Sequence, residues 1–260
     1  GKTVFNGKAV AERLTYVEKQ GWRKRGYFAY TLSPDDIHIS EWHWEDDENG
    51  PVILYAEPTE GRPYVVGGDT AGDGSDYFVG QVLDNITGRQ VCVLRHRYDE
   101  DTYARQMYCI ETNFSTYPVK LLALMGYPKL YVREVEDDYT GRIKQAYGFQ
   151  TNRTTRPVIL SELIRILRES MASINDRDTL LEMLTFVRRE KDLQGEAESG
   201  AHDDCVLALA IAHYIRPQQT MEIKRPRGER VRWSQDLWDD YNKATPAERE
   251  AMIRLWGRPE

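Results

Sequence analysis

The sequence predicts an α/β protein in which helices flank a central sheet. Three strands joined by short turns are expected over 64–98, because runs of β-branched and aromatic residues alternate there with clusters of Gly, Asp and Asn. Short turns between successive strands make an antiparallel meander. Helical periodicity over 158–170 and a strongly apolar helix over 201–215 provide layers that can cover such a sheet.

Composition limits the class of protein. The 260 residues are 40% hydrophobic and 30% charged, as in ordinary soluble globular proteins, and no apolar run is long enough to cross a membrane. The net charge of −7 argues against a protein that simply coats nucleic acid. The three cysteines are scattered without a CxxC pair, so neither a zinc site nor a disulfide framework is indicated, and a reducing cytoplasm fits.

Residues 1–60 are predicted to form a small α+β appendage. Helical spacing over 8–20 follows Asn-Gly, a typical start signal. The segments 36–44 and 51–57 flank an acidic turn and suggest a β-hairpin.

The predicted main domain spans 61–217. After the meander, the pattern favours helices over 99–108 and 118–125 and a short strand over 129–133. A further helix is expected over 178–185, ahead of a short extended segment.

Residues 218–260 differ in composition from the rest. A basic stretch with proline and glycine, 224–232, is expected to be a linker. Thr245 begins a capping box with proline at the first helical position, so the chain is predicted to end in a helix.

The stretch YVVGGDTAGDGSDYFVGQVLD, from Tyr64 to Asp84, concentrates acids at one end of a predicted hairpin. Asp69 ends the first strand, and Asp73 and Asp76 lie in the turn. Carboxylates gathered on a tight turn repel one another unless a cation neutralises them, and hard oxygen ligands suit Mg²⁺ or Mn²⁺. The alternative is a solvated turn, since Asp and Gly are ordinary turn residues.

Further acids follow later in the chain. Glu111 comes after the meander, and His202, Asp203 and Asp204 are expected in the first turn of the late apolar helix. Separated carboxylates that converge on one sheet edge can hold the two metal ions of a phosphoryl-transfer site. Each position also has a structural explanation, because acids in a first turn complement the helix dipole and His202 can act as a cap.

Several motifs together resemble a known family. They are VVGGDTAGDGSDYFVGQVLD, IETNFSTYP, LYVRE with TGRIKQAYGF, and EMLTFVRRE followed by GAHDDCVLALAIAH. In this order they resemble the nuclease domain of tailed-bacteriophage large terminase subunits. The resemblance implies a ribonuclease H-like fold of the integrase superfamily, with a mixed sheet of the antiparallel meander plus parallel strands. It matches Asp69 to the first catalytic acid, Glu111 to the strand-borne acid and the Asp203–Asp204 pair to the helix-borne acid, with Asp76 assisting the second metal.

The resemblance also implies an activity and partners. The chain is expected to be an endonuclease that cuts concatemeric viral double-stranded DNA with two Mg²⁺ or Mn²⁺ ions, in the host cytoplasm during infection. Portal protein and the small terminase subunit are the expected partners. No Walker A motif is present, so the packaging ATPase domain is expected to lie outside this chain. Arg133, Arg142 and Lys144, expected on a polar loop that follows the strand over 129–133, are candidates for holding the DNA backbone.

One departure and two alternatives stand beside this interpretation. The span from Asp99 to Glu111 is short for the helix, connection and apolar strand that the family places there, so a segment before Glu111 could be missing. An actin/sugar-kinase fold would need a second Asp-Gly phosphate hairpin, which the sequence lacks. A non-catalytic docking module of a packaging motor, with a weak or vestigial metal site, is the other alternative.

Overall fold

A computed structural model describes most of the chain and divides it into two compact units, residues 1–220 and 221–260. The described residues are 2–34, 39–59, 62–69, 77–97, 100–114, 132–136, 143–147, 149, 151–188, 195–197, 202–219, 238, 241–244, 249 and 252–253. In the second unit, Trp238 packs edge-on against Tyr241 with ring centroids 5.8 Å apart. The predicted linker over 224–232 lies outside the described residues, as does most of the predicted terminal helix.

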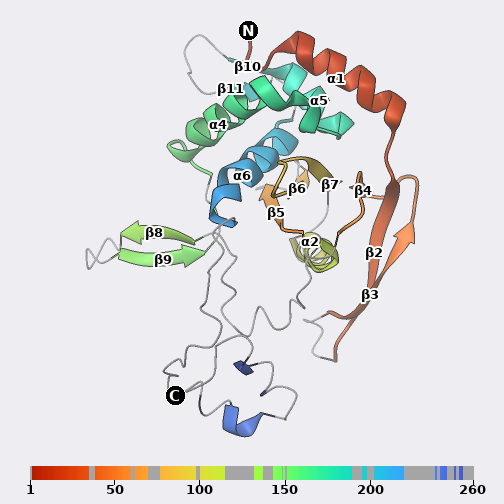
Figure 1. Ribbon diagram of the computed structural model, residues 1–260, viewed down its shortest axis with the longest axis vertical. Helices are drawn as coiled ribbons and strands as arrows, with labels where there is room; N and C mark the ends of the chain where they lie inside the picture. Colours follow the sequence, from red (N-terminus) through yellow and green to blue (C-terminus); the bar gives the residue numbers. More distant parts are fainter. Residues whose placement is uncertain are drawn as a thin grey trace. The chain divides into compact units, whose positions relative to one another are not determined.

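A six-stranded sheet forms the centre of the first unit, in the order β3-β2-β4-β7-β6-β5 (Figure 1). Its strands are β2 (Lys24–Leu32), β3 (Ile39–Asp46), β4 (Val52–Leu54), β5 (Tyr64–Asp69), β6 (Phe78–Asp84) and β7 (Gln90–His96). The antiparallel meander β5-β6-β7 confirms the prediction for 64–98. All pairs between described strands are antiparallel, so the predicted parallel strands are not found in this part of the chain.

The pairing of the N-terminal strands differs from the prediction. The expected hairpin between 36–44 and 51–57 is wrong, because β3 pairs with β2, and β4 lies between β2 and β7. Strands from both sides of residue 60 therefore belong to one sheet. The domain boundaries at residues 60 and 217 stay predictions.

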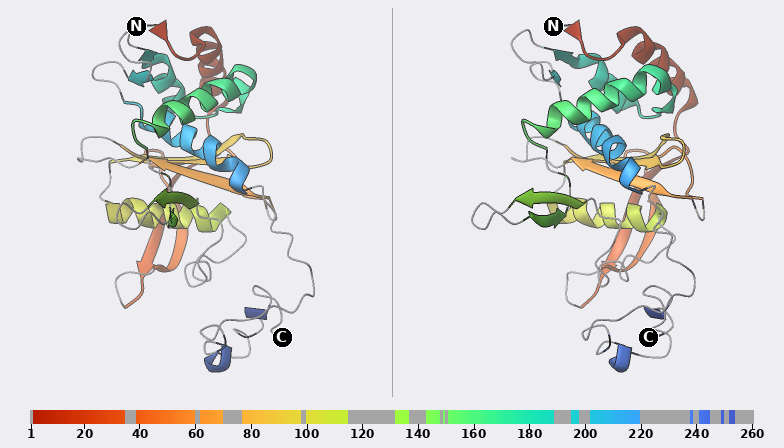
Figure 2. Two further views of the ribbon diagram at one scale, coloured as in Figure 1. Left: turned by 90° about the vertical axis from the view of Figure 1, so that its left-hand side faces the viewer. Right: turned by 60° about the vertical axis from the view of Figure 1, so that its left-hand side comes forward.

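Helices cover both faces of the sheet. Figure 2 shows α6 (Asp204–Gln219) on one face and α2 (Glu100–Phe114) on the other. Outside α6 lie α4 (Thr155–Ser170), α5 (Arg177–Thr185) and α1 (Gly7–Gln20), which share one apolar core with it. A second core lies between the sheet and α2. Because β6 is buried at every position, it forms the middle of this layered arrangement.

Side-chain caps fix where two of the predicted helices begin. Asn6 accepts a hydrogen bond from the Ala9 N–H at 3.2 Å at the start of α1, and Asp176 accepts one from the Thr179 N–H at 2.7 Å at the start of α5. At the end of α1, Gly21 takes a left-handed φ of 68°, which closes the helix through its N–H to Val17. The expected helices over 8–20, 158–170 and 178–185 are confirmed, since each begins one to three residues earlier than predicted and ends at the predicted residue.

Two smaller sheets complete the first unit. One contains β1 (Lys2–Thr3), β10 (Phe186–Arg188) and β11 (Gly195–Ala197). The other is the hairpin of β8 (Val132–Glu136) and β9 (Ile143–Tyr147), and a short η1 turn (Met171–Ser173) follows α4. The predicted helix over 118–125 lies outside the described residues. Among the helices that are described, none has the length and apolar character needed to traverse a bilayer.

Candidate active site at the start of helix α6

A glycine brings β5 into direct backbone contact with α6. A Cβ atom at Gly67 would lie 2.5 Å from the backbone nitrogen of Ala212 and 2.6 Å from the carbonyl oxygen of Ala208. These distances are too short for any side chain, so the strand and the helix touch only because position 67 has none. The contact fixes the position of α6 along β5.

This contact determines where Asp69 lies. Alternate residues of a strand share a face, so Asp69 is on the same face as Gly67, the face that α6 covers. Two residues of strand advance about 6.6 Å, which equals the rise of about four residues of helix. Val79, which pairs with Asp69, packs against Cys205 and Ala208, so Asp69 lies level with the start of α6, and it is half-buried.

Asp204 is at the same end of the β5–β6 hairpin. Its Oδ2 accepts a hydrogen bond of 3.2 Å from the backbone N–H of Tyr77, which immediately precedes β6. In the sheet, Asp69 pairs with Val79, two residues further along. Asp69 and Asp204 thus approach the end of one hairpin from the strand and from the helix. Asp204 is only 8% exposed, and His202 Nδ1 lies 3.7 Å from its Oδ2.

Asp203 has a different environment. Its Oδ2 accepts a charge-assisted hydrogen bond of 2.5 Å from Arg156 of α4, and both side chains are about four-fifths buried. Its carbonyl oxygen accepts the N–H of Leu207 at 2.9 Å. The prediction that His202 and Asp203 belong to the first turn is corrected, since α6 begins at Asp204 and both residues precede it.

Glu182 of α5 is a site residue that sequence reasoning missed. Its Oε2 accepts the N–H groups of Cys205 at 2.8 Å and Val206 at 3.1 Å, which satisfies two of the free donors at the start of α6. Burial raises the pKa of Glu182 to about 7, although these N–H groups and nearby Arg95 favour its charged form. The available signal was a charged residue on the buried face of α5, next to Met183 and one turn from Thr179.

Glu111 does not lie on a strand. The chain is helical from Glu100 to Phe114, so the predicted strand placement is wrong, and a single helix fills the short span after the meander. Asp73 and Asp76 lie outside the described residues.

The three predicted DNA-contacting residues do not share one loop. Arg133 belongs to β8 and Lys144 to β9, so two of the three occupy the paired strands of one hairpin, in which Lys144 stands opposite Val135. Arg142 lies outside the described residues.

The donors available to a metal ion are carboxylate oxygens. Within the described ranges no three His, Cys, Asp or Glu side chains lie close enough together to hold a metal ion. Asp69 and Asp204 fit a hard divalent cation by chemistry, because their oxygen atoms suit Mg²⁺ or Mn²⁺. A complete metal site needs ligands beyond these two.

Comparison with known proteins gives matches among solved structures. No protein-family model matches the chain, and no curated protein does. The large terminase nuclease from thermophilic phage G20c with bound magnesium is 22% identical, with a TM-score of 0.45, over 65% of this chain and 89% of that one. The nuclease domain of the large terminase from Thermus phage P74-26 is 21% identical, with a TM-score of 0.44, over 64% and 86%. The G20c nuclease with bound cobalt is similar to the same extent, at 21% identity and a TM-score of 0.45, over 65% and 89%.

Proposed function

We propose that this chain is a metal-dependent endonuclease of viral DNA packaging, which cuts concatemeric double-stranded DNA by two-metal hydrolysis of a phosphodiester. The observation that supports this most is the β5–α6 contact at Gly67, which puts Asp69 and Asp204 at one end of a hairpin. The motifs quoted above support it independently, because both acids occupy positions that match the family's catalytic acids.

Mg²⁺ or Mn²⁺, as two ions, is the proposed cofactor. Asp69 would contact both ions, with Glu111, Asp76 and one of Asp203 and Asp204 as further ligands. When bound, such ions supply an activated water and stabilise the leaving oxygen.

The contacts at the start of α6 favour Asp204 over Asp203 as the direct ligand. The Tyr77 N–H holds the Asp204 carboxylate toward the hairpin end that bears Asp69. Asp203 is instead held by Arg156, whose guanidinium already balances its charge. Glu182 keeps the first turn in place by accepting two of its N–H groups.

The remaining proposals concern the DNA contacts, the substrate, the partners and the location of the chain. Arg133, Arg142 and Lys144 would contact the DNA backbone without reading sequence. Viral double-stranded DNA is the substrate, and portal protein and the small terminase subunit are the partners, in the cytoplasm of the infected host. The ATPase of the motor would lie outside this chain.

The test is nicking and linearisation of supercoiled plasmid in Mn²⁺, in Mg²⁺ or in EDTA. The wild-type chain is compared with Asp69→Asn and with a control, Asp101→Asn, which alters an exposed acid of α2. Metal-dependent cutting that Asp69→Asn loses and Asp101→Asn keeps is the expected result. A folded chain that cuts in neither metal would contradict the proposal and favour a docking module of the packaging motor.

A further inference from the structure

Two arginines share one tyrosine ring beside the candidate active site. The Arg95 guanidinium carbon lies 3.7 Å from the centre of the Tyr77 ring, and that of Arg97 lies 4.7 Å from it. Both distances are within the range of about 6 Å at which a cation is attracted to an aromatic face. The ring therefore orients two cationic side chains at the end of β7.

The register of the sheet places Arg95 on the face that carries the acids. Asp69 of β5 pairs with Val79 of β6, and Val79 pairs with Arg95 of β7. Directly opposite residues share a face, so Arg95 lies on the face that carries Asp69. Arg97 lies one residue beyond β7, and the Tyr77 ring that it shares with Arg95 places it beside that residue. The Tyr77 N–H also binds Asp204. One residue thus connects the arginines to the start of α6.

The two arginines differ in their acidic partners. Arg95 is mostly buried, and its guanidinium lies 3.2 Å from Asp178 and 4.0 Å from Glu182 of α5. Arg97 is exposed, and no ion pair joins it to a carboxylate among the described residues. The pair therefore leaves one positive charge that is oriented by an aromatic ring and accessible from outside.

We propose that Arg97, held on the Tyr77 ring, binds a backbone phosphate of the DNA next to the candidate active site. The identity of the ligand rests on the proposed nuclease function. A guanidinium matches the geometry of a phosphate with two parallel N–H donors, and a stacked guanidinium loses less freedom on binding. The contact is to the backbone, so it positions the duplex without selecting a sequence.

The experiment measures binding apart from cutting. Fluorescence anisotropy with a labelled duplex in EDTA gives the dissociation constant of the full chain over a series of salt concentrations. Arg97→Gln is expected to weaken binding by about threefold or more at low salt. The slope of log affinity against log salt should also fall by about 1, because one phosphate contact is lost. Arg97→Lys, which keeps the charge, should keep the slope.

Arg105→Gln is the matched control, since Arg105 also faces a tyrosine, Tyr30, at 5.9 Å, but belongs to α2 on the other face of the sheet. Its affinity and slope should equal those of the wild type. Equal slopes for Arg97→Gln and wild type would overturn the inference, even if the wild type cuts plasmid. If Arg97→Gln lowers the slope while the wild type cuts in no metal, the phosphate contact stands and the nuclease function fails.

Discussion

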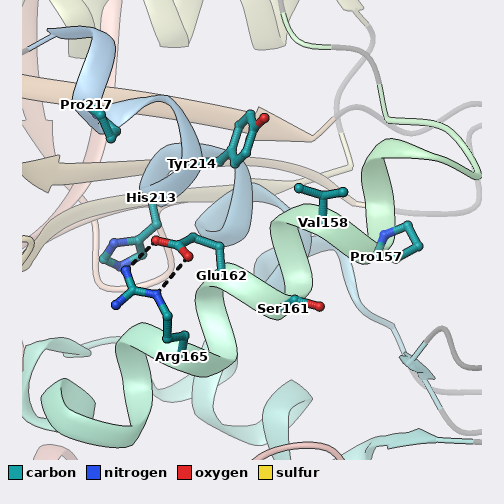
Figure 3. A pocket seen from close by; sticks show the side chains of 8 residues that line it. All are labelled: Pro157, Val158, Ser161, Glu162, Arg165, His213, Tyr214 and Pro217. Atoms are coloured by element: carbon teal, nitrogen blue, oxygen red, sulfur yellow. Dashed lines mark hydrogen bonds and ion pairs between the residues drawn. The ribbon is translucent and has the colours of Figure 1, made fainter.

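Acidic side chains lie near both ends of α6, but the partners of these acids differ between the two ends. At its start, Asp204 and Glu182 each accept hydrogen bonds from backbone N–H groups, and Glu182 lies 4.0 Å from Arg95. Its far end borders a pocket of about 590 Å³ between α4 and α6 (Figure 3). That pocket also contains an acid, Glu162, but Arg165 holds both of its oxygens, at 2.6 and 2.9 Å.

The difference shows that a carboxylate near a hollow is not enough to indicate a metal site. The pair at the far end already balances its own charge and is partly in solvent, so it gains little from a cation. At the start of the helix, burial raises the pKa of Glu182 to about 7, and at the far end burial lowers the pKa of His213 to about 4. Both shifts have one cause, because a buried site disfavours the charged form of either sign.

The largest expected effect is on plasmid cutting, and it distinguishes Asp204, at the start of α6, from Glu162, near the far end. Asp204→Asn should lower metal-dependent plasmid cutting by about a hundredfold or more, because the proposed direct ligand is lost and even outer-shell partners cost about 10- to 100-fold. Glu162→Gln should leave the cutting rate unchanged. The rates are measured from nicking time courses in Mn²⁺. A similar loss in both variants would mean that the two ends do not differ in function.

The next largest effect is on stability, and it is expected from a substitution at Gly67 that pushes α6 away from β5. Gly67→Ala places a methyl group within 2.6 Å of the α6 backbone, which cannot move aside as a side chain can, so unfolding should become easier by about 3 kcal/mol. Gly7→Ala is the control, because a Cβ there meets nothing within 4 Å. Urea denaturation of both variants gives the free energies. Equal values for the two would contradict the close contact.

His213, near the far end of α6, should make the stability of the fold depend on pH. The folded-state pKa of His213 is about 4, below its ordinary value of 6.5, owing to burial and Arg216, and Glu162 opposes them only in part. The unfolded chain therefore takes up the proton first. The contribution is fully present above pH 6.5 and is lost as pH falls toward 4, at a total of about 3 kcal/mol.

His213→Phe should remove this loss, as seen in urea unfolding at pH 7 and pH 4.5 in EDTA. The difference between variant and wild type is the relevant quantity, because the raised pKa of Glu182 has the opposite sign and weakens the fold as pH rises toward 7. His43→Phe, at an exposed ring on β3, is the control and should follow the wild type. An unchanged pH profile in His213→Phe would show that the imidazole is not responsible.

The smallest expected effect is on stability, and it distinguishes two arginines of α4, Arg156 and Arg165. Arg156→Gln should cost about 1 to 2 kcal/mol, because it leaves the part-buried Asp203 without its charged donor. Arg165→Gln should have no measurable effect, since its pair with Glu162 is exposed. Thermal unfolding at neutral pH distinguishes them. Equal shifts would mean that the Arg156–Asp203 pair contributes no more than a surface pair.

Local patterns in the sequence predicted which segments form helices and strands better than they predicted which strands pair with each other. The meander, α1, α4, α5 and most of α6 follow from periodicity and caps, which depend on near neighbours. The pairing of β3 with β2 is set by a register across the sheet that periodicity does not contain. The strand over Lys24–Leu32 was missed because small, aromatic and charged residues mix there without clear alternation.

The candidate site shows the same division. Asp69 and Asp204 could be named from the sequence because each stands at the end of a recognisable element. Glu182 could not, since its role depends on α5 lying against the start of α6. Glu111 was placed on a strand by resemblance, whereas the chain continues as a helix through it.

The hydrogen bond between Tyr77 and Asp204 joins residues 127 positions apart in the chain. A contact between residues so far apart in sequence has a larger entropic cost of loop closure than a local contact. A chain leaving the ribosome exposes Asp69 in its hairpin long before Asp204 has been synthesised. The order of the sequence therefore separates the synthesis of the two acids, and a partly made chain lacks both Asp204 and the helix that carries it.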